Sequence, residues 1–173
     1  MAVGIVRRID ELGRIVIPKE MRKTMRLQVG DEMEISANDE GLTLKRYTGF
    51  QSVLPSLKAL AKTLASATGK DVLILSASEV VLCEGKNKKK FVGARLTGDF
   101  SDLIRKRNRE SVSGDFSKAF ENVDGHGYIL CEPVVSGGDF FGCVALVSEV
   151  EIADEQKTYL NFCAEMISAT LCQ

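Results

Sequence analysis

The chain has 173 residues, enough for one ordinary domain or two small ones, and its 23 basic and 24 acidic side chains leave a formal net charge of −1. No apolar run is long enough to cross a membrane and the N-terminus lacks the apolar stretch of an export signal, so we expect a soluble, cytoplasmic protein. Five cysteines without a C-x-x-C pair and a single histidine argue against a zinc site and predict reduced thiols in a core.

Charge is unevenly distributed along the chain. Residues 1–30 hold seven basic and three acidic side chains, a net charge of +4, whereas residues 31–173 hold sixteen and twenty-one, a net charge of −5. A concentrated positive region on a slightly acidic body attracts phosphate in a defined orientation. The distribution therefore favours a nucleic-acid partner, which the overall pI of about 5.9 does not indicate by itself.

Two short apolar stretches and a turn open the chain. Residues 5–9 and 15–17 have the β-branched composition of strands, and between them lies Asp-Glu-Leu-Gly, where Gly13 can adopt a positive φ at little cost. Pro18 ends the second strand and suits the start of a helix, which we predict over residues 19–25. The first 25 residues should therefore form a strand, a turn, a strand and a short helix.

Basic side chains gather on this segment. For any single arginine a solvated surface is an equal alternative, but seven cations against three acids between residues 7 and 26 favour a binding surface for the set. Arginine's planar fork can reach phosphate oxygens and guanine edges in a DNA groove. The segment is a candidate DNA-binding surface.

The run GIVRRIDELGRIVIPKEMRKTMRL, followed by VGDEMEI, resembles the DNA-binding domain of the AbrB family of transition-state regulators from about Gly4 to Tyr47. The resemblance implies two chains that interleave hairpins into a swapped β-barrel dimer with basic loops on one face. It also implies regulation of sporulation genes, as activator and repressor, by a nucleoid-associated protein. The positions that match the family's DNA-contacting residues are Arg7, Arg8, Arg14, Arg22 and Lys23.

Two further strands are predicted at residues 33–37 and 42–47, with a turn between them. Four strands and one short helix in some forty-seven residues cannot bury much apolar surface alone, so this domain should need a partner chain. We expect the first domain to span residues 1–50 and a second domain to span residues 51–173.

Two amphipathic helices, at residues 54–67 and 154–171, bracket the second domain. Their apolar faces could cover the domain's own sheet or pair with another subunit, and both can hold together. Because the terminal stripe is wide, we expect a four-helix contact between second domains that makes a homotetramer. Its expected residues are Leu54, Leu57, Leu60, Leu64, Tyr159, Phe162, Met166 and Ile167.

Between these helices, strands are predicted at residues 72–76, 80–83, 128–135 and 140–148, with a helix near residues 99–104. This element order resembles the GAF family of small-molecule-binding sensor domains and makes the chain an α+β protein. The ligand signature of that family's cyclic-nucleotide-binding members is not present, so any small-molecule ligand stays unidentified.

Catalytic machinery is not apparent. The lone His126 lies between glycines and is predicted as a turn residue, and residues 136–138 lack the flanks of a nucleophile elbow. The basic runs at 86–90 and 105–109 are more typical of solvated surfaces than of phosphate contacts. We therefore expect a transcription regulator that is not an enzyme and has no metal site or cofactor. A swapped-hairpin antitoxin and an enzyme with an appended DNA module are the alternatives.

Overall fold

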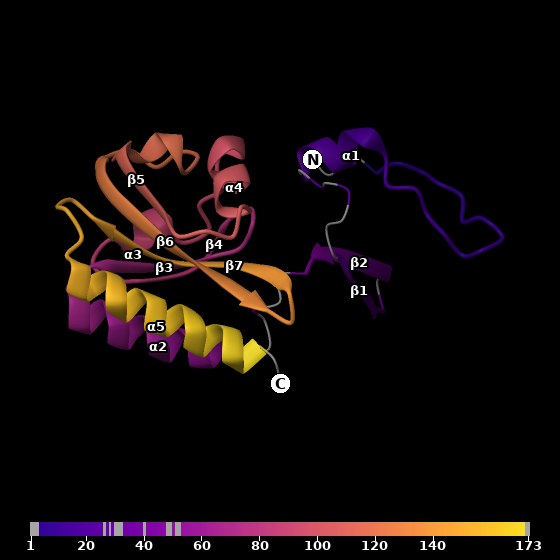
Figure 1. Cartoon of the computed structure of the whole chain (residues 1–173). Coiled ribbons are helices and arrows are strands. Elements are labelled where there is room, and N and C mark those ends of the chain that lie inside the picture. The colour runs from indigo at the N-terminus through magenta and orange to yellow at the C-terminus, as the bar shows by residue number, and fades with distance from the viewer. Residues whose placement is uncertain are drawn as a thin grey trace. The chain divides into compact units, whose positions relative to one another are not determined.

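The computed structural model describes residues 4–25, 27, 29, 33–39, 41–47, 50 and 53–171 (Figure 1). Arg26, the turn predicted near residues 30–32 and Cys172 lie outside the described residues. The chain divides into two compact units, Met1–Tyr47 and Thr48–Gln173.

In the first unit, the predicted helix and the second pair of strands are confirmed. Helix α1 spans Lys19–Thr24, and the backbone N–H of Arg22 donates to the carbonyl of Pro18 at 2.9 Å. Pro18 ends the preceding extended segment with ψ at 148°, and Glu20 lies in the first turn, where the helix dipole favours a carboxylate. Strands β1 (Met33–Asn38) and β2 (Gly41–Arg46) pair antiparallel.

The strands predicted at residues 5–9 and 15–17 are not present in the single chain, although the turn between them is. Residues 4–10 and 14–18 have no assigned secondary structure. The N–H of Gly13 donates to the carbonyl of Asp10 at 2.9 Å, and Gly13 has the expected positive φ of 74°. A strand needs a neighbour to complete its ladder, and within the described part of one chain these two stretches have none.

The second unit contains a five-stranded antiparallel sheet in the order β4-β3-β7-β6-β5. The predicted hairpins are confirmed as β3 (Asp71–Leu75) with β4 (Val80–Glu84), and β6 (His126–Ser136) with β7 (Asp139–Ser148). Strand β5 (Glu110–Asp115) was not predicted, because its sequence, ESVSGD, has a single β-branched aliphatic residue. His126 begins β6, so its prediction as a turn residue is wrong.

Helices cover both faces of this sheet. Helices α2 (Leu54–Thr68) and α5 (Asp154–Leu171) run side by side across one face, and α3 (Lys88–Phe91) and α4 (Gly98–Ile104) lie on the other, as Figure 1 shows. A short 3-10 turn, η2 (Phe116–Lys118), adds to the second layer. The sheet has one buried core on each face, because successive side chains of a strand point to opposite faces. On β3, Leu73 packs in the core with α3 and α4, whereas Val72 and Ile74 pack in the core with α2 and α5.

Local signals explain where α2 begins and ends. Pro55 occupies its first turn, and Gly69 closes it in the left-handed conformation, with φ at 67° and its N–H donating to the carbonyl of Ala65 at 2.9 Å. Just before α2, Phe50 is fully buried in the core beneath the sheet.

Four cysteines are buried and free: Cys83, Cys131, Cys143 and Cys163. Burial raises the pKa of the Cys83 and Cys143 thiols to about 12 and places that of Cys131 well above its ordinary value. Buried thiols with raised pKa values are poor nucleophiles, so these side chains act as packing groups.

Candidate nucleic-acid interface

The turn between the two arginine-bearing stretches is organised by Asp10. Its Oδ1 accepts the backbone N–H groups of Leu12 at 3.0 Å and Arg14 at 2.8 Å, and its Oδ2 accepts Nε of Arg14 at 2.7 Å. Hydrogen bonds from the backbone and then the side chain of Arg14 hold the pKa of Asp10 below its ordinary value of 3.8. The carboxylate therefore fixes both the turn and the direction of one guanidinium.

Sequence reasoning missed this role of Asp10, although a signal for it was present. An aspartate whose carboxylate can accept the N–H two residues later is the pattern of an Asx turn. The run Asp-Glu-Leu-Gly was interpreted only through its glycine.

The structure distributes the five predicted DNA-contacting side chains over three local settings, and all are exposed. Arg7 and Arg8 lie on the stretch without assigned secondary structure before the turn, and Arg14 lies directly after the turn. Arg22 and Lys23 occupy the last turn of α1, where the negative end of the helix dipole favours cations. Helix α1 contains no buried residue, so it can approach a ligand over its whole length.

Apolar side chains in the same unit are exposed as well. Val6 is 90% exposed, Val16 73% and Ile35 65%. Among the described residues of Met1–Tyr47, Pro18 alone is buried. Within its described residues, one copy of this unit therefore contains strands and a helix but no core.

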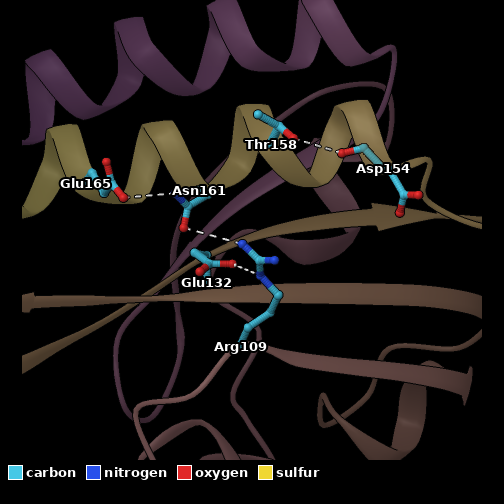
Figure 2. Close-up of polar contacts among 6 residues, drawn as sticks. All are labelled: Arg109, Glu132, Asp154, Thr158, Asn161 and Glu165. Carbon is cyan, nitrogen blue, oxygen red and sulfur yellow. Dashed lines mark hydrogen bonds and ion pairs between the residues drawn. The ribbon is translucent and has the colours of Figure 1, made fainter.

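The second unit carries a polar network rather than a reactive site, and Figure 2 shows it. Glu132 on β6 is only 8% exposed and accepts Nε of Arg109 at 2.5 Å. That hydrogen bond raises the pKa of Arg109 above its ordinary value. Arg109 also reaches Oδ1 of Asn161 on α5 at 3.4 Å, and Nδ2 of Asn161 donates to Glu165 at 2.9 Å. The network ties helix α5 to the β6 and β5 side of the sheet.

An open cavity of about 360 Å³ adjoins this network and is lined by Arg109, Asp154, Lys157, Thr158 and Asn161. Its two cations are engaged: Arg109 with Glu132, and Lys157 with Asp154 at 2.7 Å. The part of the chain that the structure describes contains no cluster of histidine, cysteine and acidic residues that could hold a metal ion. It also contains no helix long and apolar enough to span a membrane.

A two-domain arrangement, with exposed cations on a small first unit and a separate α+β second unit, is that of a DNA-binding transcription regulator. Residues 6–52 match the family described as antidote-toxin recognition MazE, bacterial antitoxin. Residues 56–171 match the family described as stage V sporulation protein T C-terminal, transcription factor. The chain belongs to the stage V sporulation protein T family.

Relatives of known identity extend this assignment. Stage V sporulation protein T of Bacillus subtilis (strain 168) is 33% identical over 162 residues, which cover 89% of this chain and 88% of that protein. The transition state regulatory protein AbrB of the same organism is 37% identical over 87 residues, covering 50% of this chain and 91% of AbrB. These similarities confirm the AbrB resemblance, and they identify the chain as a DNA-binding transcription regulator and not an enzyme.

The fold of the second unit is similar to a solved structure. The cofactor-binding GAF domain of the nutrient sensor CodY from Clostridium difficile superposes with a TM-score of 0.50 at 14% identity, covering 66% of this chain and 83% of that one. The α+β fold, with an AbrB-like first domain and a GAF-like second domain, is thus confirmed.

Proposed function

We propose that this protein regulates sporulation genes as a homo-oligomer, binding DNA through a basic face built from two interleaved first domains. One observation carries the proposal: the same small unit has exposed cations and also exposed apolar side chains that a single chain does not bury. The first domain would span residues 1–50 and the second residues 51–173.

The dimer is supported by the exposed apolar side chains of the first unit. Burying apolar surface contributes about 25 cal/mol per Å², so an exposed set that includes Val6, Val16 and Ile35 gives a strong drive for association. Residues 5–9 and 15–17 have no assigned secondary structure and no ladder partner among the described residues of one chain. A second copy would supply both the partner strands and the missing half of the core.

DNA contact is supported by the placement of Arg7, Arg8, Arg14, Arg22 and Lys23. All are exposed, and the orientation of Arg14 is fixed by Asp10. Arginines on turns and helix ends can contact both phosphates and base edges. A twofold dimer would present the set twice at a fixed spacing, and binding should weaken steeply as salt rises.

A second contact, through α5, would extend the dimer to a tetramer. Phe162 is 60% exposed, Met166 44% and Tyr159 40%, whereas Ile167 is buried against the sheet. On α2, Leu57 and Leu64 are likewise buried against their own sheet, so they are not available for the expected four-helix contact. The proposed interface therefore narrows to the exposed stripe of α5 and the half-buried Leu54 and Leu60.

The second domain would sense a small molecule and pass its state to the DNA-binding face, so that the protein both activates and represses genes while associated with the nucleoid in the cytoplasm. The antitoxin alternative is supported by the MazE-type match of residues 6–52. It fits less well, because the match of residues 56–171 to a transcription-factor domain occupies the place of a toxin-binding tail.

The test is promoter-DNA binding at several salt concentrations. The double variant Arg14→Gln with Arg22→Gln should weaken binding by at least about tenfold if each side chain contributes about 1 kcal/mol or more, and it should flatten the salt dependence. Lys58→Gln with Lys62→Gln, which removes the same charge from exposed positions on α2, is the matched control and should bind like the parent. Equal binding by both doubles, with the oligomer unchanged, would refute the proposed interface.

A further inference from the structure

An open cavity of about 340 Å³ lies at the edge of the second unit, next to α3. Its walls are the segment that follows α3 and the segment that follows η2. These walls are joined by a hydrogen bond of 2.7 Å from the N–H of Glu121 to the carbonyl of Arg95, and by a β-bridge between Leu96 and Phe120. The lining residues are Lys90, Val92, Gly93, Ala94, Arg95, Glu121, Asn122 and Val123.

Next to the cavity, an aromatic cluster holds the wall in place. The ring of Phe91 meets that of Phe116 edge-on at 5.7 Å and that of Phe120 at 5.5 Å. All three phenylalanines are buried, and Val123 in the lining is only 2% exposed. Packed rings restrict side-chain motion, so the cavity has a rigid and partly apolar wall.

Two cations, Lys90 and Arg95, line the cavity. The Nζ of Lys90 lies 5.2 Å from the ring centre of Phe116 and 5.7 Å from that of Phe91. An ammonium over aromatic faces keeps its charge while its position is restricted. Arg95 is fixed through its backbone, which bridges Glu79 of the adjoining segment. In contrast, Lys88 on the same short helix is paired with Glu84 at 2.7 Å.

The lining is net positive. It contains Lys90 and Arg95 against one acidic side chain, Glu121. The backbone also turns sharply here, because Gly93 has φ at 74° and Asn122 has φ at 56°, a conformation uncommon for a residue with a side chain. Left-handed residues of this kind are enriched at ligand sites, where the surrounding structure holds them in place.

We infer that this cavity binds a small organic anion, whose carboxylate or phosphate group contacts Lys90 and Arg95 while its carbon portion lies against Val92 and Val123. The inference rests on the proposed sensing role of the second domain and specifies the chemistry of its ligand. A cavity of about 340 Å³ is at the small end of ligand sites and has room for about ten water-sized groups. The ligand class is therefore a metabolite-sized anion rather than a nucleotide.

The test is isothermal titration calorimetry of the full chain with sodium phosphate and, separately, with sodium succinate, each at ionic strength held constant with sodium chloride. The parent should show saturable binding of at least one of the two anions. Lys90→Gln with Arg95→Gln should weaken that binding at least about tenfold, because two charge-assisted contacts are lost. Lys86→Gln with Lys89→Gln removes the same charge from exposed neighbours outside the lining and should stay within about twofold of the parent.

The pattern of results separates this inference from the proposed function. Saturable binding of phosphate alone, or of succinate alone, identifies which anionic group the site accepts. Binding of neither anion, or an equal loss in both double variants, would overturn the anion site. DNA binding without added anion should be the same in the parent and in Lys90→Gln with Arg95→Gln, so failure of the anion site leaves DNA binding intact. If circular dichroism shows that the double variant is misfolded, Arg95→Gln alone should still weaken binding at least about threefold, and an unchanged affinity would overturn the inference.

Discussion

The two units of this chain differ in how they use apolar residues. The second unit buries its apolar side chains on both faces of one sheet, and Leu73, Leu146 and Leu160 have no exposed surface. The first unit has strands, a helix and a well-formed turn, yet Pro18 is its one buried residue among those described. The difference teaches that a single chain forms both the secondary structure and the buried core of its second unit. In the described residues of the first unit, a single chain forms secondary structure and turns but no buried core.

The largest expected effect comes from charging the apolar stretch after the turn. Neighbouring residues of a strand point to opposite faces, so in Ile15→Asp with Val16→Asp at least one carboxylate would enter a core that two chains form. An unpaired buried charge should cost about 3 kcal/mol or more of dimer stability, measured by urea unfolding. If the first unit instead functions as a single chain, Ile15 and Val16 stay exposed, and the loss of stability should be below about 0.5 kcal/mol.

Leu12→Asp provides the control for that change. Leu12 is 74% exposed and lies at the tip of the turn, away from the stretches expected to pair. Its substitution should change stability by less than about 0.5 kcal/mol. A large loss in this control would show that any added negative charge, and not burial, destabilises the unit.

The next effect concerns the network around Glu132. Replacing Arg109 by Met leaves the buried carboxylate of Glu132 without its partner, and it should cost about 2 kcal/mol in denaturant unfolding, because the exposed half of Arg109 is screened by solvent. Adding Glu132→Leu should recover most of the loss. Under conditions where the variant stays folded, DNA binding without added ligand should not change, because the network includes none of the five proposed DNA-contacting residues. A loss of DNA binding under those conditions would contradict the proposed DNA interface.

Charging the exposed stripe of α5 should change assembly without changing the fold. Phe162→Asp with Met166→Asp should split tetramers into dimers in sedimentation, since both side chains are exposed in one chain. Each dimer would keep one DNA-facing surface but lose avidity, which can exceed tenfold. An unchanged sedimentation coefficient with an intact circular-dichroism spectrum would refute the α5 interface.

The smallest effect is a pH dependence of the turn. Because the folded-state pKa of Asp10 is lower than 3.8, the turn's contribution is fully present above pH 3.8 and is lost as the pH falls further through the folded-state pKa. Asp10→Asn should remove this dependence and weaken DNA binding about two- to fivefold through a less ordered Arg14. The chemical shifts of the Leu12 and Arg14 amides report the titration of Asp10, because both amides donate to its carboxylate. An identical acid titration in the variant would contradict the role of Asp10 in the turn.

Sequence patterns predicted elements whose determinants are local. Gly13, Pro18 and Gly69 act within one turn of the backbone, and the near-continuous apolar run in residues 140–147 is typical of a strand buried on both faces. Strand β5 was missed because its position depends on antiparallel pairing of the whole strand with β6. This pairing is a long-range effect, and the serines and glycine of β5 do not indicate it. The anion cavity was missed for the same reason, since Lys90 and Asn122 become neighbours only in the fold.

The pairing expected at residues 5–9 and 15–17 follows from their β-branched composition, but it is absent from the described residues of a single chain. Hydrogen–deuterium exchange of the full-length protein, without DNA and at a concentration where it is assembled, tests this most directly. If two chains complete the first domain, the amides of residues 5–9 and 15–17 should exchange at least about a hundredfold more slowly than in an unfolded chain, and protection should fall on dilution. Exchange at the unfolded rate in a protein that remains assembled would contradict the account.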